Sequence, residues 1–536
     1  MRLLHSLAKI HATFDDPNLV SRAGLVPVMA LAQRAGLGDL AGAQVRPAGR
    51  CGVNAAAKVA CLVAGMAGGA DSIDDLDLLR HGAMPALFGG VRAPSTLGSF
   101  LRSFTWGNVL QLGKVNRLLL AELARRAPLL PGKDAVAFVD IDSMQKRVYG
   151  HKKQGAAFGH TKIGGKSLLV RGLNALAATI STPLGAPVVA ATRLRGGSAG
   201  SARGAASFAR QAVGTARDAG CTGLLVARAD SAFYSAAFTG AVRAAGAYFS
   251  VTVQMNPHVA AAIAAIGEDA WTPIRYPRAI WDDQLGCWVS DAEVAEAEYT
   301  AFTSKKGQAI TARLIVRRVK DLNRKAGEGQ DELFTVWRYH AVFTDSPFET
   351  LQAEAQHRDH AVVEQVLADW TDGPMAHMPS GSFPANAAWL TLAAISHNLL
   401  RTAGSLASLA YARARGATLR RDLIDVAART SRHGRGEITL HLPEGWHRQT
   451  EWMNLFDAAC RLPPAADAGG LTSPDTGHAP QRPTAATRPP FPDQEDHPQA
   501  AAEARGQAAM PGLTRRNSAC TDRAKMIYHN SSVDPG

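Results

Sequence analysis

Two short apolar strands, each ending in a carboxylate, constrain the fold of this chain more than any other feature. The first, AVAFVDID, starts at Ala135 and ends on Asp142, and the second, GLLVARAD, ends on Asp230. A strand that is apolar at nearly every position is typical of a sheet buried on both faces. Because a helix is predicted over residues 202–219, between the two strands, we expect an α/β core over residues 131–256.

The segments around this core follow other patterns. Residues 1–130 show repeated helix start and stop signals, which predict a helical N-terminal domain. Residues 257–348 carry strand-like runs separated by SKKGQ and NRKAGEGQD, which predict an all-β insertion. The α/β core is expected to resume over residues 349–462. Residues 463–536 are rich in proline, alanine and polar residues, which predicts a disordered tail.

The charge balance bears on the partner. The chain has 58 Lys and Arg against 46 Asp and Glu, a net charge of +12. Because residues 463–536 are close to neutral, the positive charge belongs to the folded part. Such a balance favours a polyanionic partner, although arginine-rich genome composition explains it equally well.

Cysteine usage and hydropathy bear on location. The six cysteines contain no CxxC pair, which argues against a zinc knuckle or a disulfide framework. No apolar run of 18 residues occurs, so we expect a cytoplasmic protein without a membrane partner.

Three carboxylates are the strongest candidates for chemistry. Asp142 and Asp230 end the two strands, and Glu364 lies in the helical pattern HRDHAVVEQVL. Three such groups suit two Mg²⁺ ions, which prefer oxygen ligands and support phosphoryl transfer. Asp140 points to the same strand face as Asp142, so either is within reach of a metal, although Asp142 lies nearer the strand end. A strand-end aspartate is also often only a cap for the following turn.

The helical pattern carries a rival metal site. His357, His360 and Glu364 fall on one helix face, which suits a zinc or manganese hydrolase. The HExxH arrangement of zinc proteases is absent. The alternative is that both histidines face phosphate or solvent.

The motifs, taken in order, carry a family resemblance. FVDIDSM, RADSAFY, a β-rich insertion and HRDHAVVEQVLADW with the trailing AAWLTLAAISHNLLR resemble the bacterial insertion-sequence DDE transposases whose ribonuclease-H-like core is interrupted by a β-strand domain. The nearest likeness is to insertion-sequence family thirteen-eighty, related to the insertion-sequence four-like group. The resemblance covers residues 1–460.

This resemblance implies a function. It implies a cut-and-paste DNA transposase that binds the terminal inverted repeats of its element through residues 1–130, cleaves the DNA ends and joins the 3′ hydroxyls to target DNA. It also implies Mg²⁺, replaceable by Mn²⁺, double-stranded DNA as partner, a homodimer on paired ends, and association with the bacterial nucleoid. Asp142, Asp230 and Glu364 are the implied catalytic and metal-binding triad, and Asp142 with Ser143 matches the family's Asp-Ser/Thr pair.

The chain departs from the family along the helix of Glu364. Related enzymes carry Tyr, Arg, the catalytic Glu and Lys there, whereas this chain has His357, His360 and Thr371 at the Tyr, Arg and Lys places. Arg358 is a candidate for part of the missing charge. The departures leave two alternatives, a catalytically degenerate DNA-binding relative and a generic metal-dependent nuclease.

Further DNA contacts are predicted from basic and aromatic residues. Lys162 and Lys166 follow the first strand, and Trp288, Arg317 and Arg318 lie in the predicted insertion. Basic residues interleaved with aromatics suit a groove in which a ring stacks on an unpaired base. A solvated hairpin face explains the lysines equally well, and a β-sheet core explains the tryptophan. The helix residues His357, Arg358 and His360 complete the predicted DNA contacts.

Overall fold

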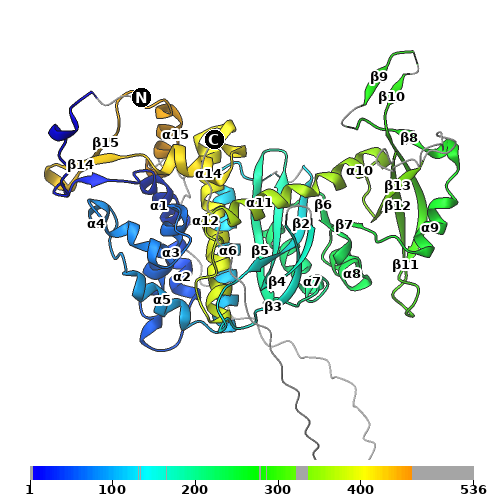
Figure 1. The fold of residues 1–536 in the computed structure, drawn as a ribbon, viewed down its shortest axis with the longest axis horizontal. Coiled ribbons are helices and arrows are strands. Elements are labelled where there is room, and N and C mark those ends of the chain that lie inside the picture. Colours follow the sequence, from blue (N-terminus) through cyan, green and yellow to red (C-terminus); the bar gives the residue numbers. More distant parts are fainter. Residues whose placement is uncertain are drawn as a thin grey trace, which may run out of the picture. The chain divides into compact units, whose positions relative to one another are not determined.

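The fold is described from a computed structural model (Figure 1). Contacts group residues 1–466 as one unit, to which all of the description below applies. The predicted tail lies outside the described residues. Those residues are 4–130, 132, 135–163, 166–276, 279–284, 286–320 and 336–461.

Helices make up most of the N-terminal part, as predicted. They are α1 (Leu25–Arg34), α2 (Leu37–Gln44), α3 (Ala55–Ala67), α4 (Met84–Leu87), α5 (Pro94–Arg102) and α6 (Trp106–Arg126). Helix α6 starts with a capping box, in which the Thr105 hydroxyl accepts from the backbone N–H of Asn108 and the Asn108 side chain accepts from that of Thr105. These helices surround α12 (Phe383–Ala407), which contacts α3 and α6. Because α12 is buried nearly all round, it is a core helix of the whole unit.

A large mixed sheet follows, as the apolar strands predict. Its first strands are β2 (Ala137–Arg147), β3 (Ala157–Ile163), β4 (Lys166–Thr182), β5 (Gly185–Gly196), β6 (Leu225–Ala229) and β7 (Tyr248–Thr252). Strands β2, β6 and β7 are parallel neighbours, and β4 runs antiparallel to β2, β3 and β5. Helices α7 (Ala205–Asp218) and α8 (Ala236–Ala244) make the connections between β5, β6 and β7. Strand β2 continues to Arg147, past the end predicted for it at Asp142, so Asp142 lies within β2, beside the carboxyl end of β6.

The region of the predicted insertion differs from the expectation in two ways. It begins with a helix, α9 (Pro257–Ala264), and its long strands extend the same sheet because β13 pairs with β7. Antiparallel strands β13, β12 and β11 then continue outward to β8, and β9 pairs with β10 as a separate hairpin. The bounds are β8 (Thr272–Pro273), β9 (Ile280–Asp282), β10 (Cys287–Val289), β11 (Ala292–Ala301), β12 (Ile310–Lys320) and β13 (Trp337–Thr344).

Helices then return across the sheet. Helix α10 (Thr350–Arg358) contacts β11 and β12, and α11 (Val362–Thr371) contacts β2, with a short 3₁₀ turn (Asp359–Ala361) between them (Figure 1). The later elements are α13 (Leu409–Arg413), α14 (Gly416–Leu419), a π-helical turn (Arg420–Ile424), β14 (Ala428–Arg432), β15 (Ile438–His441) and α15 (Gln449–Cys460). Strand β14 pairs with β1 (Leu19–Val20), so both ends of the described chain share one small sheet.

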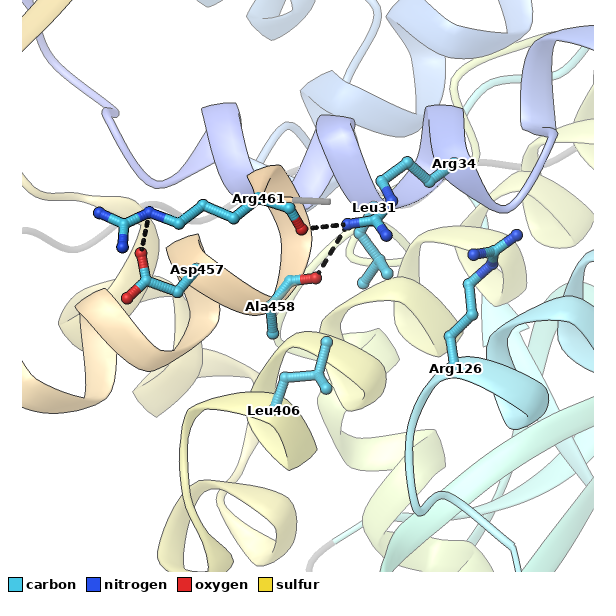
Figure 2. A pocket seen from close by; sticks show the side chains of 7 residues that line it. All are labelled: Leu31, Arg34, Arg126, Leu406, Asp457, Ala458 and Arg461. Atoms are coloured by element: carbon cyan, nitrogen blue, oxygen red, sulfur yellow. Dashed lines mark hydrogen bonds and ion pairs between the residues drawn. The ribbon is translucent and has the colours of Figure 1, made fainter. Parts of the chain in front are cut away.

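A cavity of about 460 Å³ lies where α1, α12 and α15 meet the end of α6 (Figure 2). In it Arg34 donates to the carbonyl oxygens of Ala458 and Ala459, in the last turn of α15, and of Arg461, just after the helix. A guanidinium in this place caps the negative end of a helix. None of the predicted site residues lines this cavity. Within the described part of the chain, no helix is long and apolar enough to cross a membrane.

Candidate active site

Asp142 and Asp230 are brought together by the pairing of β2 with β6. The two strands are parallel, and Asp140 lies opposite Arg228. Asp142 and Asp230 each lie two residues further on, so both side chains project from the same face at the same edge of the sheet. Asp230 also caps the following turn, because its Oδ1 accepts from the backbone N–H of Ala232 at 3.0 Å. The capping interpretation and the site interpretation are therefore compatible.

Burial and neighbouring charge raise the pKa of Asp142 to about 6. Burial is the largest cause, and the negative charges of Asp230 and Glu364 act in the same direction. The backbone N–H of Ser143, which donates to Asp142 Oδ1 at 2.6 Å, and the charge of His360 oppose the rise. Asp230 and Glu364 therefore both lie close enough to act on Asp142.

Glu364 lies in the first turn of α11, exposed, with α11 packed against β2. The expectation of one continuous helix through this segment is wrong, because the 3₁₀ turn separates α10 from α11. His360 lies in that turn, and its Nδ1 is 2.7 Å from the carbonyl oxygen of His357. Both His360 and Glu364 lie close enough to Asp142 to influence its pKa.

Asp140 has a different environment from Asp142. Its side chain is fully buried, and its carboxylate accepts from Arg228 Nε at 2.5 Å and Arg228 Nη2 at 2.8 Å. Ser181 Oγ donates to the same carboxylate at 2.5 Å. Since these bonds occupy both carboxylate oxygens, Asp140 is not placed to bind a metal at the site edge.

His357 does not fit its predicted contact with DNA. The side chain is 4% exposed, and both ring nitrogens lie 2.9 Å from hydroxyls of β7, those of Ser250 and Thr252. Burial lowers the pKa of His357 well below its usual value, so the ring is neutral. The same contacts exclude the rival site in which His357, His360 and Glu364 bind one transition metal.

Two predicted DNA contacts are engaged in ion pairs with one carboxylate. Glu354 binds Arg317 Nη1 at 2.5 Å and Arg358 Nε at 2.8 Å, and its own side chain is 4% exposed. The bonds join α10 to β12. Arg358 remains partly exposed, whereas Arg317 is mostly covered.

Arg318 is buried rather than available to DNA. Its guanidinium lies over the rings of Trp271 and Trp337, at 4.2 and 4.4 Å from their centroids, and forms ion pairs with Glu268 and Glu293. The predicted DNA contact at Arg318 therefore does not fit the geometry. A buried arginine between two rings and two carboxylates holds the sheet together.

The remaining predicted contacts lie at the ends of hairpins. Lys162 is in β3 and Lys166 in β4, on either side of their connection, but both side chains lie outside the described part of the chain. Trp288 is partly buried and lies opposite Trp281 in the β9–β10 hairpin, with their ring centroids 5.2 Å apart. Arg275 lies over the Trp288 ring at 5.3 Å.

The donor set at the sheet edge fits a hard divalent cation. Asp230 and Glu364 both raise the pKa of Asp142, and a bound cation would relieve this repulsion. In the described ranges, no three His, Cys, Asp or Glu side chains are close enough to share one ion as they stand. The residues that would hold such a cation are Asp142, Asp230 and Glu364.

Sequence reasoning missed Arg228, the partner of Asp140. It is 2% exposed, it lies 4.1 Å from the ring centroid of Phe138, and its Nη1 donates to the carbonyl oxygen of Gln356 in α10. The signal was present, since Arg228 is the single charged residue inside an otherwise apolar strand.

Comparison with known proteins identifies the family. No curated protein matches the chain. A family model described as transposase DDE domain group 1 matches residues 4–464, which is nearly all of the described chain. The sheet edge with its three carboxylates lies inside the match. The chain belongs to this family and is a DDE-type transposase, an enzyme that acts on DNA.

Proposed function

We propose that this transposase moves its own insertion sequence by cut-and-paste, binding the terminal inverted repeats, cleaving the DNA ends and joining the 3′ hydroxyls to target DNA. The observation that carries the proposal is that Asp230 and Glu364 both act on Asp142, which lies in β2 beside the carboxyl end of the parallel strand β6. Strand order supports a ribonuclease-H-like core, since β5, β4, β2, β6 and β7 are successive neighbours with β4 antiparallel. The resemblance in motif order supports membership of insertion-sequence family thirteen-eighty.

Asp142, Asp230 and Glu364 are the proposed ligands of two divalent cations, with Mg²⁺ as the physiological ion and Mn²⁺ as a substitute. When bound, such ions activate the attacking water or 3′ hydroxyl and stabilise the leaving oxygen. The chain positions Asp142 within β2, Asp230 directly after β6, and Glu364 on a helix packed against β2. His360, which acts electrostatically on Asp142, is positioned to contact a DNA phosphate beside these carboxylates.

The contacts to the DNA phosphates are the part of the proposal for which the family's Tyr and Lys are missing. His357 is buried and Thr371 is uncharged, so neither supplies a cation for the DNA phosphates. We propose that Arg358 and His360 take this part, both being partly exposed on the same segment. Assembly as a homodimer on paired ends is proposed from the resemblance alone.

The experiment is cleavage of a labelled duplex that carries the repeats flanking the coding region, in Mg²⁺ or Mn²⁺, with a scrambled-end duplex as control. Asp142→Asn, Asp230→Asn and Glu364→Gln are expected to abolish nicking while end binding is retained. Asp359→Asn is the matched control, since Asp359 is an exposed carboxylate in the turn just before α11.

Four outcomes have distinct meanings. Nicking confined to the repeat boundary and lost only in the three triad variants supports the proposal. Binding without cleavage at any metal concentration identifies a degenerate relative, for which the missing Arg and Lys positions argue. Equal cleavage of both duplexes identifies a general nuclease, and cleavage by Asp230→Asn overturns the triad.

A further inference from the structure

A buried ion pair lies directly beneath the proposed metal site. Asp140 is 0% exposed and Arg228 is 2% exposed, and two nearly parallel hydrogen bonds join them. Asp142 and Asp230 each lie two residues further along the same strands. Because burying two charges is costly, their retention inside a sheet calls for a reason beyond the filling of space.

The guanidinium of Arg228 makes a third bond that leaves the sheet. Its Nη1 donates to the carbonyl oxygen of Gln356 in α10, while Nε and Nη2 bind Asp140. Ser181 Oγ on β4 supports Asp140 from the other side. One side chain thus joins β2, β6 and α10, and the planar fork of arginine suits it to do so.

The chain after Gln356 continues this anchoring toward the site. His357 is bound through both ring nitrogens to hydroxyls on β7, and His360 Nδ1 lies 2.7 Å from the His357 carbonyl oxygen. Glu364 follows four residues after His360. A continuous series of contacts therefore runs from Arg228 to the helix that carries the third carboxylate.

Tertiary contacts must set the position of Glu364, because the chain path does not. Strand β7 ends at Thr252 and α10 begins at Thr350, so the strands beyond β7 come between them. Like charges on Asp142, Asp230 and Glu364 repel one another, which pushes α11 away from the strands. The bond from Arg228 to α10 opposes this separation.

We propose that Arg228 is a positioning residue, which uses its buried ion pair with Asp140 to hold the Glu364 helix in register with Asp142 and Asp230. The inference rests on the proposed triad. Arg228 touches neither metal nor DNA in this role. Its removal should weaken metal binding more than it weakens the fold, because supporting contacts behind metal ligands commonly change affinity or activity 10- to 100-fold.

The test compares variants with different combinations of the two partners. Asp140→Leu with Arg228→Met removes both charges and leaves an apolar pair of similar bulk, a replacement that buried ion pairs often tolerate. Asp140→Asn leaves the arginine charge buried without its carboxylate and should be the less stable variant. Arg228→Lys keeps the charge but cannot bind Asp140 through two nitrogens and Gln356 at once.

Metal binding is read without activity, as the rise in melting temperature on titration with Mn²⁺, and then as the Mg²⁺ concentration for half-maximal cleavage. For the double variant we expect a melting temperature near that of the wild type without metal, unchanged binding to end DNA, and a half-saturating metal concentration raised at least about 10-fold. A folded double variant with wild-type metal dependence and turnover overturns the proposal. If the double variant does not fold, the same measurements on Arg228→Lys decide.

Asp230→Asn in the same titration separates this inference from the proposed function. If Asp230→Asn binds Mn²⁺ and cleaves like the wild type, the triad itself is wrong. If Asp230→Asn is inactive while the double variant behaves like the wild type, the triad stands and the role of Arg228 is refuted.

Discussion

Asp140 and Asp142 lie two residues apart on the same face of β2 and yet have opposite electrostatic environments. Arg228 neutralises Asp140 in the interior, whereas Asp142 faces the negative charges of Asp230 and Glu364. Strand β2 thus carries Asp140, whose charge is neutralised by an ion pair, and Asp142, whose ionised form is disfavoured by neighbouring negative charges. The difference decides which of the two is available to a cation.

The first prediction concerns how far ionised Asp142 lowers the free energy of unfolding. Its pKa is raised from 3.8 to about 6, so the folded state binds this proton more tightly than the unfolded state. Ionised Asp142 therefore destabilises the fold, fully above pH 6 and progressively less as the pH falls toward 3.8. Without metal at pH 8, Asp142→Asn should raise the free energy of unfolding by about 1–3 kcal/mol.

Denaturant unfolding with a chelator at pH 8 and at pH 4 checks this, with Asp359→Asn as control. The gain should be large at pH 8 and small at pH 4, and the control should show none. Mg²⁺ should stabilise the wild type more than Asp142→Asn. A variant less stable than the wild type at pH 8 would contradict the electrostatic account.

The second prediction concerns buried His397 in α12. Burial, with Arg401 nearby, lowers its pKa to about 4, and its Nε2 donates to the Pro187 carbonyl oxygen at 3.0 Å. Between pH 6.5 and 4 the unfolded state binds the proton more tightly, so stability is lost as the pH falls through this window. Over this pH range the wild type should lose about 2–3 kcal/mol more of its free energy of unfolding than His397→Gln loses.

The free energy of unfolding, measured from pH 7.5 to 4.5, tests this. His258→Gln is the control, because His258 is exposed and should leave the pH dependence unchanged. Buried His357 titrates in the same direction and remains in both variants. If the free energies of unfolding of the wild type and His397→Gln fall in parallel with pH, His397 is not the cause of the lost stability.

Local sequence pattern predicts much of the architecture. The rest depends on the pairing of strands that lie far apart in the sequence. Apolar runs are sufficient to locate β2 and β6, and strand parity places Asp142 and Asp230 together. Sequence pattern does not reveal that β13 pairs with β7, because that register joins segments about ninety residues apart. The break at Asp359–Ala361 also escapes prediction, since no glycine or proline marks it.

The candidate site shows the same division. An aspartate and an arginine, each inside an apolar strand, give a usable signal for a buried pair, but the partner of each becomes evident only when the strands are aligned. Arg318 and His357 show the converse error. Both are polar residues that the sequence predicts to contact DNA, and burial among Trp271, Trp337, Ser250 and Thr252 removes them from the surface.

The third prediction separates structure from DNA contact at Arg318. Because Arg318 is buried between two rings and pairs with Glu293 at 2.6 Å, Arg318→Ala should lower the free energy of unfolding by about 1–3 kcal/mol. DNA affinity of the folded fraction should be unchanged. Lys305→Ala is the control, since Lys305 is exposed in the β11–β12 turn.

Thermal unfolding and filter binding on the same samples provide both readouts. The expected pattern is a lowered melting temperature with normal affinity for Arg318→Ala. A stable variant with weakened, less salt-sensitive DNA binding would instead show that Arg318 contacts phosphates.

The fourth prediction concerns the β9–β10 hairpin, which projects from the sheet (Figure 1). Trp281 and Trp288 are opposite each other, Trp281 is 48% exposed, and Ile280 and Val289 beside them are 72% and 55% exposed. Exposed aromatic rings on a short hairpin contribute little to the core and suit stacking on unpaired bases, where each stacked base contributes about 1–3 kcal/mol. Trp281→Ala with Trp288→Ala should therefore lower affinity for a duplex with unpaired end bases about 10-fold or more.

Matched duplexes make this test specific. The double variant should bind a fully paired duplex like the wild type and should keep its melting temperature, because neither ring is in the main core. Val289→Ala, on the same hairpin, is the control for loss of exposed apolar surface. A fall in melting temperature without any change in binding would place both tryptophans among the structural residues of the hairpin, and equal losses on paired and unpaired duplexes would exclude base stacking as their role.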